Sequence, residues 1–230
     1  MVVCRGNCAS EAQTLGLVVP VTSFSMLAFP TSPTAKAMKA PARSETPQCI
    51  YQLHIALQEL EPLIWRRIWV ADNLTLAKLD RVIQTVMGWT NSHLHEFEID
   101  GQRYGMVPDE FPVDNPAKLD RGFRLAEILG TTVQSFSYTY DFGDNWQHVV
   151  TVEELLKPDP EFNTWPICLG GQHACPPEDV GGIGGYIDFL EAMQDPEHDE
   201  HRAMWRWHGG PFDPYGFDMN AANRALQRLR

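Results

Sequence analysis

Carboxylates and a histidine are concentrated in the stretch from Phe136 to Val150. Asp141, Asp144 and His148 lie close together there, and Trp146 stands between the last two. A carboxylate that orients an imidazole makes a general base, and the same groups can bind a divalent metal ion. The alternative is structural, because Asp residues in turns accept hydrogen bonds from nearby backbone N–H groups. The sequence leaves both interpretations open.

Residues of the same types occur in two other segments, one before this stretch and one after it. Two histidines begin an alternating segment, and an acidic pair precedes a Gly-rich run. We therefore predict a binding cluster drawn from three segments: His93, His95, Asp141, Asp144, Trp146, His148, Glu178 and Asp179. As a metal-dependent site, it would be centred on Asp141, Asp144 and His148.

A second candidate site is the segment that contains Cys168, His173 and Cys175. Two thiols and an imidazole offer three ligands that zinc prefers, and His93, His95 or His148 would add a fourth. The cysteines are more widely spaced than in common zinc sites, so the alternatives are two thiols packed as small apolar groups, or a disulfide in an oxidising environment. Zinc or another divalent metal is the cofactor that this segment suggests.

The elements that must position these groups can be inferred from periodicity. Phe136, Tyr138 and Tyr140 alternate with Ser and Thr, which is typical of a half-buried strand, and the alternation resumes at Trp146. The polar residues between the two runs, with Gly143 among them, predict a turn. The stretch is therefore expected to form a hairpin.

The rest of the chain predicts further strands and helices around this hairpin. Alternation favours strands over 51–57, 63–70 and 93–99, and Asp100-Gly101 is typical of a two-residue hairpin turn. Apolar residues at helical spacing predict helices over 76–87, ended by Gly88, and over 125–129, and then from Gly185, from Asp195-Pro196 and from Asp218 onward. Residues 107–121 and 158–185 are expected to be loops.

This order of elements predicts an α+β fold rather than a regular alternation of strands and helices. We expect a mostly antiparallel sheet of about six strands, with inserted helices and a helical C-terminal part. Residues 49–230 are expected to form one domain. Residues 1–48, rich in Ala, Ser, Thr and Pro, are expected to be disordered or to be a mis-assigned extension, with Met38 as an alternative to Met1 for the true start.

The charge of the chain limits the classes of partner. The net charge is −12; the first 48 residues hold four basic and two acidic residues, so the remainder carries −14. A body this acidic repels phosphate backbones, which argues against direct nucleic-acid binding unless its arginines gather on one face. No apolar run is long enough to predict a transmembrane helix. Five cysteines favour a reducing, cytoplasmic location over a disulfide scaffold.

Several motifs together resemble one family. They are Pro62-Leu-Ile-Trp-Arg-Arg67, Met87-Gly-Trp89 with His93-Leu-His95-Glu-Phe97, Tyr140 to His148, Cys175 to Gly182 with Gly185-Tyr186, and Phe217-Asp218 with Asn223. Over about residues 49–230 the chain resembles the plasmid-Ri ORF-three-like family, whose members are also labelled insertion-element passenger proteins. The resemblance implies a compact α+β domain of unknown function, often encoded near mobile elements.

Three functions follow as hypotheses. The first is an interaction module with a protein partner, whose groove is lined by the central hairpin and the segment 175–186. The second is a metal-dependent enzyme, such as a hydrolase, that uses the carboxylate and histidine cluster. The third is an accessory nucleic-acid-associated protein of a transposable element, which would require Arg66, Arg67, Arg103, Arg121 and Arg124 to share one face.

Overall fold

The structure is a computed structural model that describes residues 46–106, 114–158 and 166–229. Most of the segment expected to be disordered or an extension, residues 1–45 with Met38, lies outside the described residues, as do residues 107–113 of the predicted loop. At residue 48 the chain is already fixed, because the Gln48 backbone N–H donates to the Asp72 carboxylate at 3.0 Å. No helix of the described residues is long and apolar enough to cross a membrane.

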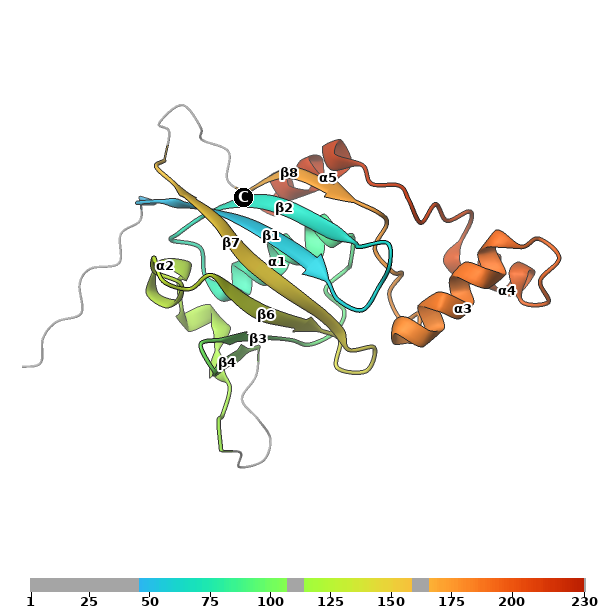
Figure 1. Cartoon of the computed structure of the whole chain (residues 1–230), viewed down its shortest axis with the longest axis horizontal. Helices are drawn as coiled ribbons and strands as arrows, with labels where there is room; N and C mark the ends of the chain where they lie inside the picture. The colour runs from blue at the N-terminus through green and yellow to red at the C-terminus, as the bar shows by residue number, and fades with distance from the viewer. Residues whose placement is uncertain (1–45, 107–113, 159–165, 230) are drawn as a thin grey trace, which may run out of the picture. The chain divides into compact units, whose positions relative to one another are not determined.

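The fold is α+β, as predicted, and is built on one eight-stranded sheet (Figure 1). The strand order is β5-β4-β3-β6-β7-β1-β2-β8, and every neighbouring pair is antiparallel except β4 with β5. The strands are β1 (Ile50–Leu57), β2 (Trp65–Ala71), β3 (His95–Ile99), β4 (Gln102–Gly105), β5 (Lys118–Leu119), β6 (Ser135–Tyr140), β7 (Trp146–Leu156) and β8 (Ile167–Gln172). The predicted central hairpin is β6 and β7, at the middle of the sheet.

The helices are α1 (Leu76–Met87), α2 (Leu125–Ile128), α3 (Gly182–Gln194), α4 (His201–His208) and α5 (Met219–Leu226), with 3-10 turns η1 (Asp120–Gly122) and η2 (Gln227–Leu229). The C-terminal part is helical, as predicted. Thr75 caps α1 by accepting from the Lys78 backbone N–H, and Gly88 ends it at φ 104°. Asp218 caps α5 by accepting from the Ala221 backbone N–H. These are the starts and stops that the sequence indicated.

Two strands were not predicted, and both lie in segments expected to be loops. β5 is only two residues long and pairs with β4. β8 has the sequence ICLGGQ, which lacks a period-two pattern, and pairs with the edge of β2. A Cβ at Gly171 would lie 2.7 Å from both the Arg66 and the Phe217 side chains. Gly171 interrupts the alternation that would have predicted a strand, and close packing requires a glycine at this position.

Two helix starts differ from the prediction. α3 begins at Gly182 instead of Gly185. The predicted helix start at Asp195-Pro196 is wrong: the helix is present as α4, but it begins only at His201. Asp195 instead holds a turn, since its carboxylate accepts from the Glu197 backbone N–H and its carbonyl from the His198 N–H. The side chain offers the backbone an alternative to the helix.

One face of the sheet packs against α1 (Figure 1). The apolar stripe of α1 is buried, and so are the alternating residues of the central strands that face it. On the central hairpin, Tyr138, Tyr140, Trp146 and His148 all belong to this buried set. The strand ends and the loops that follow them carry the polar groups described next.

Candidate functional site

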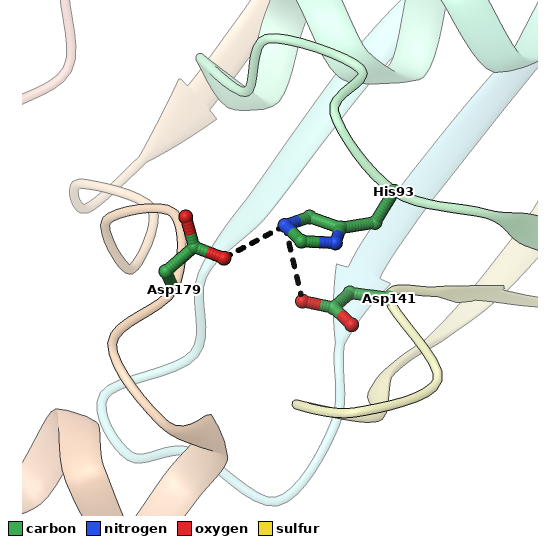
Figure 2. Close-up of side chains that lie close together, drawn as sticks. All are labelled: His93, Asp141 and Asp179. Atoms are coloured by element: carbon green, nitrogen blue, oxygen red, sulfur yellow. Dashed lines mark ion pairs between the residues drawn. The ribbon is translucent and has the colours of Figure 1, made fainter.

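Three loops bring their side chains to one point at the end of the central hairpin. His93 lies between α1 and β3, Asp141 directly after β6, and Asp179 just ahead of α3. His93 Nε2 lies 2.8 Å from Asp179 Oδ1 and 3.6 Å from Asp141 Oδ2. Figure 2 shows the two carboxylates approaching the same ring nitrogen from different loops. The three ligand atoms lie within 4.8 Å of one another.

Asp141 is held in place by its own turn. Its φ is 54°, in the left-handed region that Asp and Asn tolerate better than other side chains. Its backbone N–H donates to the Leu94 carbonyl at 2.9 Å, and its Oδ1 accepts from the Gly143 N–H at 2.9 Å. The turn interpretation is thus correct for Oδ1, while Oδ2 faces His93. One oxygen of this carboxylate therefore holds the turn, and the other lies 3.6 Å from His93 Nε2.

Glu178 connects the loop that contains Asp179 to the loop that contains His93 through hydrogen bonds. Its Oε1 accepts from the Thr90 backbone N–H at 2.6 Å and from the Thr90 hydroxyl at 3.0 Å. The Tyr140 hydroxyl donates to the same carboxylate at 3.1 Å. Glu178 Oε2 also lies 4.0 Å from His93 Nε2. The carboxylate therefore positions the site and lies at its border.

The Tyr140 hydroxyl is a second fixed point for His93. It accepts from the Ser92 N–H at 3.1 Å and from the His93 N–H at 3.3 Å while it donates to Glu178. Burial and the neighbouring Glu178 carboxylate raise the pKa of Tyr140, so its proton stays available for this bond. The backbone of the histidine is set by a side chain of the central strand.

Asp144 joins the same loops but not the group around His93 Nε2. Its Oδ2 accepts from the Gly181 backbone N–H at 3.1 Å. A Cβ at Gly182 would lie 2.8 Å from the Asp144 carbonyl, and one at Gly185 would lie 2.0 Å from the Val180 carbonyl. The Gly-rich run is therefore explained by close backbone approach at the start of α3.

His93 Nε2 has two carboxylates beside it but no aligned hydrogen bond to any described residue. This atom is also screened from solvent. Ligands about 2.1 Å from a metal, at 90–109° to one another, lie roughly 3–3.5 Å apart. The two separations from His93 Nε2, 2.8 Å and 3.6 Å, lie on either side of that range, and all three atoms lie within 4.8 Å of one another. A cation between the three atoms would satisfy all of them at once.

The cluster is open on one side. The side chain of Asp141 is 10% exposed and that of His93 31%, whereas that of Asp179 is 68% exposed. The group thus runs from the protein interior to the surface. A metal bound here would keep positions open to water or a ligand, as catalytic centres do.

Three of the predicted cluster residues lie elsewhere. Trp146 and His148 are each 1% exposed and belong to the core. His148 Nδ1 is hydrogen-bonded to the Tyr138 carbonyl at 3.1 Å, and burial lowers the pKa of His148 to about 4. The catalytic grouping of Asp141, Asp144 and His148 is therefore not assembled. The alternation that made the hairpin recognisable also turns residue 148 inward.

His95 lies in a separate buried network. Its Nε2 is hydrogen-bonded to Asp120 Oδ2 at 2.9 Å, and its Nδ1 lies 3.1 Å from Asp80 Oδ1. Asp80 also accepts from the Tyr138 hydroxyl at 2.7 Å, and burial is the largest cause that raises the Asp80 pKa. Gln84 donates to the same hydroxyl at 2.8 Å. Sequence reasoning missed Asp80, Gln84 and Asp120, although the first two are polar interruptions, one helical turn apart, in the apolar stripe of α1.

The cysteine segment does not form a ligand group. Cys168, His173 and Cys175 are absent from the metal-ligand groups of three among the described residues. Cys168 is buried, and His173 Nδ1 is hydrogen-bonded to the Leu63 carbonyl at 2.8 Å. Burial raises the pKa of both thiols. The two cysteines fit the alternative of apolar packing.

The arginines named for nucleic-acid binding do not share one free face. Arg66 is 1% exposed, donates to the carbonyls of Trp65, Val86, Gln172 and His173, and lies 3.9 Å from the Phe217 ring centre. Arg67 pairs with Glu153 at 2.6 Å and Arg103 with Glu96 at 2.6 Å. Arg66 and Arg67 point to opposite faces of β2, as expected for adjacent strand residues.

A cleft of about 470 Å³ adjoins the carboxylate side of the site. Glu178 and Trp89 line it together with Arg66, Cys175 and Phe217. It differs from the predicted groove, because the end of α1 and helix α5 form its walls in place of the central hairpin. Volumes of this size accommodate small molecules.

The comparisons with known proteins agree with the resemblance. Residues 49–221 match the model of the family described as plasmid pRiA4b ORF-3-like protein. The uncharacterized protein y4hQ of Sinorhizobium fredii is 37% identical over 182 residues, which cover 78% of this chain and 92% of that protein.

A solved structure is similar as well. The crystal structure of a protein of unknown function, MM3350 from Methanosarcina mazei Go1, superposes with a TM-score of 0.69 at 36% identity, over 77% of this chain and 98% of that one. The family model spans most of the chain, and the alignment with the relative from Sinorhizobium fredii does so too. Together these matches determine the family of the chain. The chain belongs to the plasmid pRiA4b ORF-3-like family.

Proposed function

We propose that this chain binds one divalent metal ion through His93 Nε2, Asp141 and Asp179, and that the bound ion serves a hydrolytic reaction. The observation that carries the proposal is the approach of two carboxylates to a single screened ring nitrogen that lacks an aligned hydrogen bond. One imidazole and two carboxylates suit Mn²⁺, Fe²⁺ or Zn²⁺. Three protein ligands leave a position for water, whose pKa the ion would lower.

Two neighbours support the hydrolytic class over a purely structural ion. Glu178 Oε2, 4.0 Å from His93 Nε2, is placed to accept a proton from a water molecule at the site. The cleft that Glu178 helps to line would hold the substrate beside the reacting water. The interaction-module hypothesis differs in its outcome, since it allows metal binding without turnover. The association with mobile elements stays a prediction from the resemblance.

The test is calorimetric titration of the full chain, freed of metal, with Mn²⁺ and with Zn²⁺. We expect one site per chain in the wild type and affinity at least about tenfold lower in Asp141→Asn and Asp179→Asn. Asp144→Asn is the matched control: it changes a carboxylate of the same turn, whose amide oxygen can still accept from Gly181. Its affinity should remain within about threefold of wild type.

Two results would count against the proposal. The absence of a saturable site for either ion would remove the metal centre altogether. Equal losses in Asp144→Asn and Asp179→Asn would show a nonspecific effect of negative charge. Turnover is then measured on the metal-loaded chain with chromogenic carboxyl-ester and phosphodiester probes. Metal binding without turnover of either probe would favour the interaction module.

A further inference from the structure

Helix α4 exposes a face that the metal centre does not use. Arg202, Trp205, Arg206 and Gly209 recur at helical spacing, so they share one side of the helix. Together with His201 they line an open surface hollow of about 650 Å³, which is called the cavity below. Trp205 is 43% exposed, and no residue of α4 is buried. A large aromatic surface is thus left in contact with water between two guanidinium groups.

The opposite side of α4 attaches the helix to α3. The Trp207 ring lies 5.7 Å from that of Phe189, and His201 Nδ1 is hydrogen-bonded to the Ala192 carbonyl at 2.8 Å. This bond leaves His201 Nε2 free of Ala192, and the imidazole lies 5.9 Å from the Trp205 ring. These contacts between α4 and α3 account for Trp207 and His201. They do not involve the Trp205 side chain directly.

The two arginines differ from three other arginines in the described part of the chain. Arg67, Arg103 and Arg224 each pair with a carboxylate. Among residues 46–106, 114–158 and 166–229, no carboxylate pairs with Arg202 or Arg206. In a chain of net charge −12, two unpaired guanidinium groups one helical turn apart mark a place for an external anion.

We propose that this face binds a nucleoside phosphate. Guanidinium groups donate in pairs to phosphate oxygens, and an exposed indole provides a stacking surface for a base. The cavity has the size of a small-ligand site. A longer nucleic-acid strand fits less well, because Glu197, Asp199 and Glu200 come immediately before the helix and would repel the next phosphates. The ligand is therefore a mononucleotide.

The test is calorimetric titration of the full chain with ADP in the presence of EDTA, so that no ion at His93 can recruit the phosphates. Adenosine and inorganic pyrophosphate are titrated in parallel, and each should bind more weakly than ADP. The Arg202→Glu/Arg206→Glu variant should lose at least about tenfold in ADP affinity. Trp205→Ala should lose about tenfold, and Trp205→Phe should stay within about threefold because it keeps a stacking ring.

Arg228→Glu, a charge reversal on η2 outside the cavity, is the matched control and should stay within about twofold. Circular dichroism checks that each variant is folded, which the exposure of the substituted side chains leads us to expect. The proposal fails if ADP gives no saturable binding at millimolar concentration, or if the double arginine variant binds like wild type. It also fails if pyrophosphate binds as well as ADP, or if an eight-residue oligothymidylate binds more than about tenfold tighter per site, which would indicate a strand reader.

Discussion

His93 and His95 lie two positions apart, and each contacts two aspartates, yet the arrangements differ in one respect. At His95 the carboxylates are distributed, Asp80 at Nδ1 and Asp120 at Nε2. At His93 both carboxylates approach Nε2. At His95 the contact of Nε2 with Asp120 is a hydrogen bond, whereas Nδ1 lies beside Asp80 without an aligned hydrogen bond to a described residue. At His93 a single N–H at Nε2 cannot donate a well-aligned hydrogen bond to both carboxylates, and the cation proposed above would bind all three groups.

The two histidine groups also differ in how far their side chains are buried. The His95 side chain is 2% exposed and its carboxylate partners 2% and 4%, whereas the Asp179 side chain is 68% exposed. A buried ion-pair network specifies how the helix, the sheet and the η1 turn fit together. A half-exposed group can exchange ligands with solvent. The comparison therefore favours a structural role for His95, and it leaves His93 accessible for the metal binding proposed above.

The largest effect is expected on the free energy of unfolding, where substitutions of His95 and of His93 should differ. His95→Ala would leave Asp80 and Asp120 buried without their shared partner, at a cost of about 3–5 kcal/mol in the free energy of unfolding. His93→Ala removes a group at the protein surface and should cost less than about 1 kcal/mol. Urea unfolding of both variants measures the difference. Equal losses would contradict the division into a structural and a chemical histidine.

His148, the third histidine of the predicted cluster, gives a pH dependence. Burial lowers its pKa from 6.5 to about 4, so between these values the unfolded chain binds the proton more readily than the folded one. The stabilisation that neutral His148 contributes to the free energy of unfolding is therefore complete above pH 6.5. It decreases as the pH falls toward 4. The loss is on the order of 3 kcal/mol.

Urea unfolding of wild type and of His148→Leu between pH 4 and 7 measures this contribution. The leucine variant keeps an apolar side chain of similar volume but cannot titrate. Its unfolding free energy should fall less steeply with acid than that of wild type. The same slope in both proteins would mean that His148 does not titrate differently in the folded and unfolded states.

The sequence predicted the fold class and most element boundaries, because these depend on local signals. The hairpin turn at Asp100-Gly101 has positive φ at both residues, as its composition indicated. The missed strand β8 is held by β2 and packs its glycines against Arg66 and Trp65. No local pattern encodes such a pairing.

The candidate site was predicted in part. Five of its eight predicted residues, His93, Asp141, Asp144, Glu178 and Asp179, do meet at the three loops. The distinction between His93 and His95 could not be predicted, since both precede or begin a strand in the same polar context. It depends on Asp80 and Asp120, which tertiary packing brings to His95. By contrast, the inward direction of His148 follows from its alternation with Trp146 and Val150, and the pairing of β6 with β7 places it beside Tyr138.

The smallest expected effect compares two tyrosines of β6, one for each histidine. The Tyr138 hydroxyl lies in the His95 network, whereas the Tyr140 hydroxyl holds Glu178 and the His93 backbone. Tyr138→Phe and Tyr140→Phe each remove one buried hydroxyl, at about 1–2 kcal/mol in unfolding free energy. Because Tyr140 fixes the loop of His93, only Tyr140→Phe should also weaken Mn²⁺ binding, by about tenfold.

Urea unfolding and calorimetric titration with Mn²⁺ of the same two variants provide the readout. Tyr138→Phe is the control for the loss of a hydroxyl on this strand, since its effect on stability should equal or exceed that of Tyr140→Phe while its metal affinity stays at the wild-type value. A loss of affinity in both variants would mean that the two networks are coupled, through Gln84, which bonds both Tyr138 and the Asn91 backbone N–H. That result would mean that the groups around His93 and His95 are not independent. They would belong to one continuous polar network from η1 to the loop of His93.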